Sequence, residues 1–160
     1  MKQDRFLTGI LLGIAVLILL ALAVFFTRQD DLAYVDEATP QGVVQNYIVA
    51  LQKRDYEKAY TYLADLEYKP SYQQFRESFF NYMVSPSGVG VEILQTETSD
   101  DLATVGLSII YNQRDPFGSS SRYLDYARLV RQDGAWKIKQ LPGGNFWAYD
   151  WYQPTPAPAK

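Results

Sequence analysis

The sequence predicts an α+β domain that follows a single N-terminal transmembrane helix. Residues 6–26 form an apolar run that no charged residue interrupts. Downstream of this run, apolar residues recur at helical spacing in three segments, and from about residue 89 they alternate with polar residues as in strands. Three helices followed by four strands in antiparallel meander order predict three helices packed on a four-stranded antiparallel curved sheet.

The apolar run has the length and composition of a membrane span. At about 1.5 Å per helical residue it reaches roughly 30 Å, which is the thickness of the hydrocarbon core of a bilayer. Lys2 and Arg5 precede the run, whereas Asp30, Asp31 and Glu37 are among the acidic residues that follow it. Because basic residues favour the cytoplasmic side, we expect residues 1–28 to be a single-pass anchor in the cell membrane. Its N-terminus would be cytoplasmic and the C-terminal domain extracytoplasmic.

A cleaved signal peptide is the alternative interpretation of this run. Ala21 and Ala23 resemble the small residues of a cleavage site. Against cleavage, the run is longer than the usual apolar region of a signal peptide, about 7–15 residues, and Val24, Phe25 and Phe26 continue it. The sequence therefore favours an anchor.

Two glycines within the run, Gly9 and Gly13, have the spacing that lets helices approach closely in lipid. Glycine is also common in membrane helices without such a role. If the spacing is used, the span pairs either with a copy of itself or with another membrane subunit.

Composition excludes several classes of function. The chain has 160 residues, a formal net charge of −3, no cysteine and no histidine. Nucleic-acid binding needs a basic face, so no nucleic-acid partner is expected. The absence of histidine removes the commonest general base, and the absence of cysteine removes disulfides and lipoprotein anchoring. The pairs Asp30–Asp31 and Asp100–Asp101 lie outside any calcium-loop pattern, so no metal or cofactor is predicted.

Local signals mark the start of each predicted helix. Residues 29–38 are polar and acidic and are interpreted as a solvated linker, after which Thr39 and Pro40 suit the N-cap and first position of a helix. Asp55 can cap a second helix, and Ser71 with Gln74 forms a capping box for a third.

Turn signals separate the predicted strands. Residues 85–88 form a turn cluster, and residues 98–101 are typical of a hairpin turn. Residues 115–121 are interpreted as a longer loop, and Asp133–Gly134 is a strong signal for a two-residue hairpin. The domain is expected to span residues 39–152, and the proline-rich residues 153–160 are interpreted as a disordered tail.

The order of these pieces resembles a known family. The pattern from Thr39 to Tyr60, together with the pattern Asp133-Gly134-x-Trp136-Lys137-Ile138, is similar to nuclear-transport-factor-two-like (cystatin-like α+β cone) domains. The resemblance covers about residues 39–141. It implies a cone-shaped fold, in a family that includes isomerases, dehydratases, polyketide cyclases, assembly domains and membrane-anchored bacterial proteins. It carries over no catalytic residue, because no catalytic aspartate–tyrosine set of the family aligns with this chain.

A pocket between the helices and the sheet would be lined by tyrosines. Tyrosine supplies a flat apolar body and one hydroxyl, which suits a hydrophobic ligand with one polar end. Asp125 could act there as a general base if it faced inward, or pair with a basic residue if it faced outward. The pocket candidates are Tyr47, Tyr60, Tyr111, Tyr123, Tyr126 and Asp125. The same tyrosines could instead simply fill the core.

A cluster of aromatic residues follows the last predicted strand. Such a cluster either packs back on its own domain, contacts a partner, or lies at the lipid headgroups. The candidate partner contacts are Phe146, Trp147, Tyr149, Trp151 and Tyr152.

Together these observations predict a membrane-anchored extracytoplasmic binding or assembly module. One role for such a module is that of an accessory subunit of a membrane protein complex. Its expected partners are the lipid bilayer and either a membrane protein or a second copy of the chain. The alternative function is a small-molecule isomerase or dehydratase that uses a tyrosine-lined pocket with Asp125.

Overall fold

The computed structural model describes residues 5–27, 32–81, 89–111 and 121–142. It divides into one unit up to Leu32 and a second unit from Ala33 onward, and each is described by itself. The aromatic segment 146–152 and the tail 153–160 lie outside the described residues, as do the turn at 85–88 and most of the loop at 115–121.

The first unit is the apolar helix α1 (Arg5–Thr27). Its residues Leu7–Val24 are long and apolar enough to cross a membrane, and none of them is buried within the protein. A Cβ atom added at Gly9 or Gly13 would meet no described atom within 4 Å, so both positions present open backbone on the helix surface.

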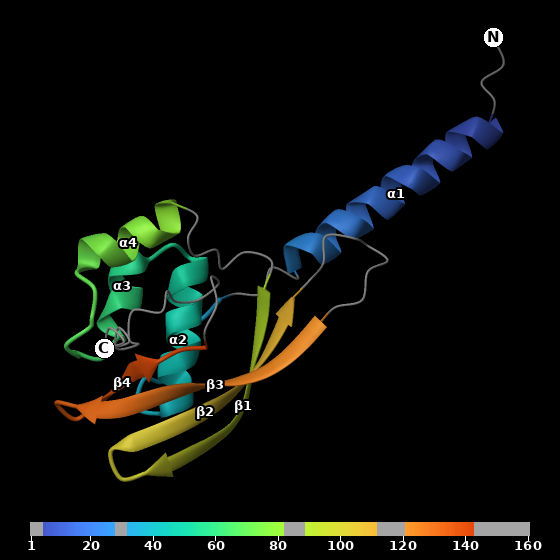
Figure 1. The fold of residues 1–160 in the computed structure, drawn as a ribbon. Helices are drawn as coiled ribbons and strands as arrows, with labels where there is room; N and C mark the ends of the chain where they lie inside the picture. Colours follow the sequence, from blue (N-terminus) through green and yellow to red (C-terminus); the bar gives the residue numbers. More distant parts are fainter. Residues whose placement is uncertain (1–4, 28–31, 82–88, 112–120, 143–160) are drawn as a thin grey trace. The chain divides into compact units, whose positions relative to one another are not determined.

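Three helices open the second unit where the sequence predicts them (Figure 1). They are α2 (Pro40–Gln52), α3 (Tyr56–Thr61) and α4 (Tyr72–Phe80). Side-chain oxygens of Thr39, Asp55 and Ser71 each accept a backbone N–H from the first turn, and Gln74 completes a capping box with Ser71. These bonds satisfy N–H groups that a helix leaves without partners at its start, which fixes where each helix begins.

Four antiparallel strands follow in the order β1-β2-β3-β4. They are β1 (Val89–Ser99), β2 (Leu102–Tyr111), β3 (Ser121–Gln132) and β4 (Ala135–Gln140). Asp133 and Gly134 join the last two strands with φ angles of 51° and 78°. Positive φ at both central residues is typical of the hairpin turn whose twist matches the strands. The predicted α+β fold and the meander order are confirmed.

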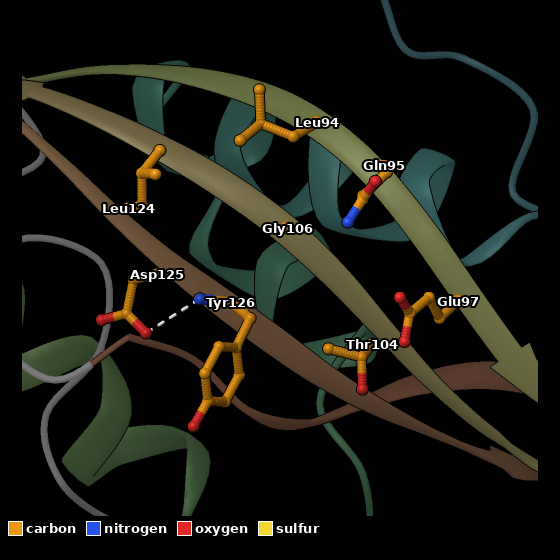
Figure 2. A pocket seen from close by; sticks show the side chains of 8 residues that line it. All are labelled: Leu94, Gln95, Glu97, Thr104, Gly106, Leu124, Asp125 and Tyr126. Atoms are coloured by element: carbon orange, nitrogen blue, oxygen red, sulfur yellow. Dashed lines mark hydrogen bonds between the residues drawn. The ribbon is translucent and has the colours of Figure 1, made fainter.

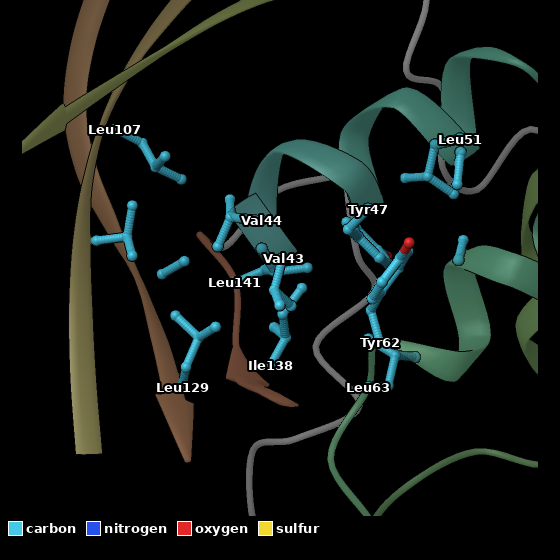
Figure 3. Packing of buried hydrophobic residues seen from close by; sticks show 14 of the residues in the cluster. Val43, Val44, Tyr47, Leu51, Tyr62, Leu63, Leu107, Leu129, Ile138 and Leu141 are labelled. Carbon is cyan, nitrogen blue, oxygen red and sulfur yellow. The ribbon is translucent and has the colours of Figure 1, made fainter. Parts of the chain in front are cut away.

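The core lies between α2 and one face of the sheet (Figure 3). Val43 and Val44 point from α2 toward apolar residues of the sheet, whereas Tyr47, the largest fully buried side chain of α2, lies beside Tyr62 and Leu63. Leu63, just after α3, forms a parallel bridge with Ile138 of β4. The backbone after α3 is therefore joined to the sheet directly. The strand residues of this core are Val89, Ala103, Val105, Leu107, Ile109, Ala127, Leu129, Trp136 and Ile138.

Candidate binding site on the outer face of the sheet

The strand register assigns each residue to one face of the sheet. Directly opposed residues of an antiparallel pair share a face. Leu107 lies opposite Ile93 on β1 and Asp125 on β3, and Leu107 is buried in the core under the helices. Gly106, the next residue back along β2, lies opposite Tyr126 and therefore belongs to the other face. We call this second face the outer face.

A β-bulge interrupts the register of β1 and changes the outer face. Between Ile93 and Thr96 the pairing with β2 shifts, so that Leu94 and Gln95 both lie against Gly106. A Cβ atom at Gly106 would lie 3.3 Å from the carbonyl oxygen of Gln95 and 3.4 Å from Cβ of Leu94. The bulged strand comes this close because the central strand carries no side chain at this point.

The missing side chain leaves a concavity of about 370 Å³, which we call the outer-face notch (Figure 2). Backbone at Gly106 forms its floor, and the walls include Leu94, Leu124 and Tyr126, which are 41%, 76% and 43% exposed. The full lining is Leu94, Gln95, Glu97, Thr104, Gly106, Leu124, Asp125 and Tyr126. This arrangement can hold an apolar group between exposed apolar walls, with carboxylates at the rim for a neighbouring donor or cation.

One wall of the notch is fixed by a basic neighbour. The guanidinium carbon of Arg128 lies 5.0 Å from the ring centroid of Tyr126, and Nη2 of Arg128 is 3.3 Å from the Tyr126 hydroxyl. A cation over an aromatic face restrains the ring at a modest energy when both groups are exposed. Arg128 thus restrains the Tyr126 ring, which lines the notch.

Asp125 pairs with Leu107 and therefore shares its face of the sheet. At Asp125, the edge of β3 that faces away from β2 is not paired with another described strand. β4 pairs only with Arg128–Gln132, so within the described part of the chain residues 121–127 have β2 on one side alone. The Asp125 carboxylate accepts the backbone N–H of Tyr126 at 2.8 Å, and so satisfies a donor on this free edge. Its register places Asp125 on the helix-facing side of the sheet, but it is held at the edge and is partly exposed.

Two of the predicted pocket residues, Asp125 and Tyr126, line the outer-face notch together, and the others lie elsewhere in the domain. Tyr47 is fully buried in the core, and Tyr126 is on the outer face. Tyr60 is half-buried: its hydroxyl donates to the carbonyl of Pro70 at 2.7 Å, and Lys69 Nζ lies 4.4 Å from its ring centroid.

Two of the predicted tyrosines contact each other where β2 ends and β3 begins. The rings of Tyr111 and Tyr123 contact edge to face, with centroids 5.4 Å apart. Burial, the neighbouring Tyr123 and the charge of Asp125 raise the pKa of Tyr111. Tyr123 is 59% exposed, so this pair forms an aromatic surface near Asp125.

A second concavity lies along one side of α4. It measures about 510 Å³ and is lined by Tyr72, Gln73, Arg76, Glu77 and Phe80. A single helix supplies all of these residues, and Arg76 covers the ring of Phe80 at 5.1 Å. The outer-face notch, by contrast, is lined by residues of three strands.

The residues of the notch were missed in the sequence analysis, apart from Asp125 and Tyr126. A signal was present, because Gly106 interrupts an otherwise apolar strand, and an isolated strand glycine indicates a bulge or a close backbone approach. The position of the bulge on β1 could not be read in the same way, since it depends on how two strands pair.

Comparison with known proteins adds information about the fold only. No family model and no curated protein matches the sequence. A solved SEC-C motif containing protein from Rhodopseudomonas palustris is similar over 66% of this chain and 79% of its own, with 12% identity and a TM-score of 0.50. A putative calcium/calmodulin-dependent protein kinase type II association domain from Thiobacillus denitrificans matches over 62% and 89%, with 12% identity and a TM-score of 0.45. At such identity the first likeness concerns the fold alone, and the second carries no weight.

Proposed function

We propose that this protein is a membrane-anchored binding or assembly module. In this proposal α1 crosses the bilayer with its N-terminus in the cytoplasm, and the second unit is an extracytoplasmic domain of the nuclear-transport-factor-two-like kind. The length and apolar surface of α1 support the anchor. Lys2 and Arg5 before the apolar run, and the excess of acidic residues such as Asp30, Asp31 and Glu37 after it, support the orientation.

The outer-face notch is the site at which a partner protein would bind. The observation that carries this proposal is the close contact of Gly106 with the bulge at Leu94 and Gln95. At this contact the outer-face notch opens between exposed apolar side chains. An exposed apolar patch with a polar rim is typical of protein interaction sites. The notch is open on one side, whereas small-molecule pockets enclose most of their ligand, so it suits an apolar anchor side chain of a partner.

Co-purification from native membranes tests this function. We expect Leu124→Asp, which places a charge at the most exposed wall, to abolish recovery of the partner, and Gly106→Ala, which raises the floor, to weaken it. Leu102→Asp is the matched control, because Leu102 is 55% exposed but is not part of the notch. If the partner is recovered equally with all three variants, or if the native protein is recovered alone, the binding function is wrong.

The anchor is tested separately. Full-length protein in vesicles should resist extraction by alkaline carbonate, and a reporter that is active only outside the cytoplasm should be active when fused to the C-terminus. Release by carbonate would show that α1 is not an anchor, and a reporter active only in the cytosol would reverse the orientation.

The geometry favours binding over the alternative of an isomerase or dehydratase. That alternative needs Asp125 beside several tyrosine hydroxyls in one cavity. Tyr47 is buried in the core and Tyr126 lines the outer-face notch, whereas Tyr111 and Tyr123 contact each other elsewhere on the sheet. The Asp125 carboxylate accepts a hydrogen bond from a backbone N–H. We therefore place no catalytic role on these residues.

A further inference from the structure

The segment that leads from α1 into the second unit is bound to the domain through Asn46. Asn46 lies on α2 and is fully buried. Its Oδ1 accepts the backbone N–H of Val35 at 2.8 Å, and its Nδ2 donates to the backbone carbonyl of Val35 at 2.9 Å. One side chain thus holds both polar groups of a residue eleven positions earlier, as a neighbouring strand would.

Two further residues of the segment are held by side chains of the domain. Glu37 accepts a 2.7 Å hydrogen bond from the hydroxyl of Tyr62, and Lys58 Nζ lies 3.6 Å from the same carboxylate. The ring of Tyr34 lies under Lys58, whose Nζ is 3.9 Å from the ring centroid. Contacts at residues 34, 35 and 37 hold this part of the predicted linker against the domain, while Val35, Asp36 and Glu37 remain exposed to solvent.

Gly42 allows this close approach. It lies on the first turn of α2, and a Cβ atom there would collide with the backbone carbonyl of Asp36. The chain passes so near to the helix that any side chain at residue 42 would displace it. Gly42 therefore offers a way to release the segment without removing any of its hydrogen-bonding groups.

We propose that this docked segment shortens the tether, so that the partner of the domain is a protein in or at the membrane surface. This inference rests on the proposed membrane anchor. With Tyr34 docked, only residues 28–33 separate the domain from the end of α1 at Thr27. At about 3.5 Å per residue, the chain from Thr27 to Tyr34 reaches at most about 25 Å. With the segment released as far as Thr39, the same limit would be about 42 Å.

Energy transfer between the domain and the lipid surface tests this inference. Because the native chain has no cysteine, a donor dye can be attached at a single Ala135→Cys substitution in full-length protein. The protein is placed in phosphatidylcholine vesicles that contain an acceptor dye on the lipid headgroups. The test variants are Gly42→Ala and Asn46→Ala, and Gln52→Ala on the exposed side of α2 is the matched control. A variant with a Gly/Ser insertion between Leu32 and Ala33 calibrates the signal of a long tether.

We expect Gly42→Ala and Asn46→Ala to lower the transfer efficiency toward that of the insertion variant, and Gln52→Ala to leave it unchanged. Hydrogen exchange at the amide of Val35 should become at least about tenfold faster in Gly42→Ala. If Asn46→Ala fails to fold, Gly42→Ala carries the test alone. The same variants should lower recovery of a partner after short-range cross-linking.

Two results would overturn the proposal that the docked segment shortens the tether. One is unchanged exchange at Val35 in Gly42→Ala, and the other is faster exchange with unchanged energy transfer. Both are distinct from failure of the proposed function, which would appear as release of the native protein from the vesicles by carbonate or as loss of the partner-binding effects at Leu124.

Discussion

The hydroxyl of Tyr62 donates a 2.7 Å hydrogen bond to Oε1 of Glu37, a residue 25 positions earlier in the chain. The Tyr62 residue is only 4% exposed, whereas the Glu37 side chain is 53% exposed. The bond therefore connects the core with the surface segment that enters the domain. A tyrosine is well suited to this place, because its ring packs among apolar residues while its hydroxyl reaches a polar partner.

Removing this hydroxyl should destabilise the domain. We expect Tyr62→Phe to lower the free energy of unfolding by about 1 kcal/mol, because the hydrogen bond is lost while the ring still packs in the core and Glu37 regains water. Denaturant unfolding of the full-length protein in detergent measures this change. Tyr68→Phe, at a residue that is 46% exposed, is the control and should change stability by less than about 0.5 kcal/mol. Equal effects of the two substitutions would contradict the role of the Glu37 bond.

The same contact predicts a loss of stability at high pH. Burial, followed by the hydrogen bond and charge of Glu37, raises the pKa of Tyr62 above its ordinary value of 10.0. Well below pH 10 the phenol is protonated in both the folded and the unfolded chain, so its contribution is complete. Above that pH the unfolded chain loses the proton first, and the free energy of unfolding falls. The fall should be less steep in Tyr62→Phe, as measured by denaturant unfolding between pH 8 and 11; identical slopes would contradict this assignment.

Ile138 joins the sheet to the segment after α3, and truncation of its side chain should strongly lower the stability of the domain. Its side chain is fully buried, its N–H donates to the carbonyl of Tyr62 at 2.8 Å, and its carbonyl accepts the N–H of Ala64 at 2.9 Å. We expect Ile138→Ala to cost about 2–5 kcal/mol of unfolding free energy, because a cavity forms where the structure cannot relax fully. Leu124→Ala, at a leucine that is 76% exposed, should cost less than about 0.5 kcal/mol in the same denaturant experiment.

The end of α2 offers a stabilising substitution. Arg54 has a φ of 60°, and the N–H groups of Arg54 and Asp55 reach back to the carbonyls of Leu51 and Ala50 at 3.0 and 2.8 Å. This is the Schellman arrangement, in which glycine is the favoured residue at the left-handed position. We expect Arg54→Gly to raise the free energy of unfolding by up to about 1 kcal/mol, since glycine adopts this conformation without strain. Gln45→Gly, at an exposed position in the middle of the helix, should lower it by about the same amount.

The free edge of β3 predicts how Asp125 affects solubility. Its carboxylate satisfies the N–H of Tyr126 where no strand of the described chain does so. We expect Asp125→Leu to promote self-association, because edge strands without charge or cover pair with other chains. Light scattering after size-exclusion chromatography measures the change. Glu57→Leu adds the same exposed side chain on α3 and should leave the mass unchanged; association in both variants would point to general hydrophobicity instead of the edge.

The sequence allowed the elements to be predicted because their signals are local. The caps at Thr39, Asp55 and Ser71 each bond a backbone group about three residues away, so a short stretch contains both partners. The Asp133–Gly134 turn is local in the same way. These predictions are confirmed.

The candidate site could not be predicted because its causes lie far apart in the sequence. The notch needs Gly106 on β2 to meet a bulge on β1, and the face of Asp125 is decided by its pairing with Leu107. The docked segment likewise depends on Asn46 reaching back to Val35. Periodicity within one strand or helix gives no information about any of these pairings.

The two hydrogen bonds between Asn46 and Val35 use only backbone atoms of Val35, and this has a consequence for how the protein can evolve. Any residue that keeps an N–H group can occupy position 35 without disturbing the two bonds. Selection on the docked segment would therefore act at positions 42 and 46, on the helix, while the residue that is held remains free to vary.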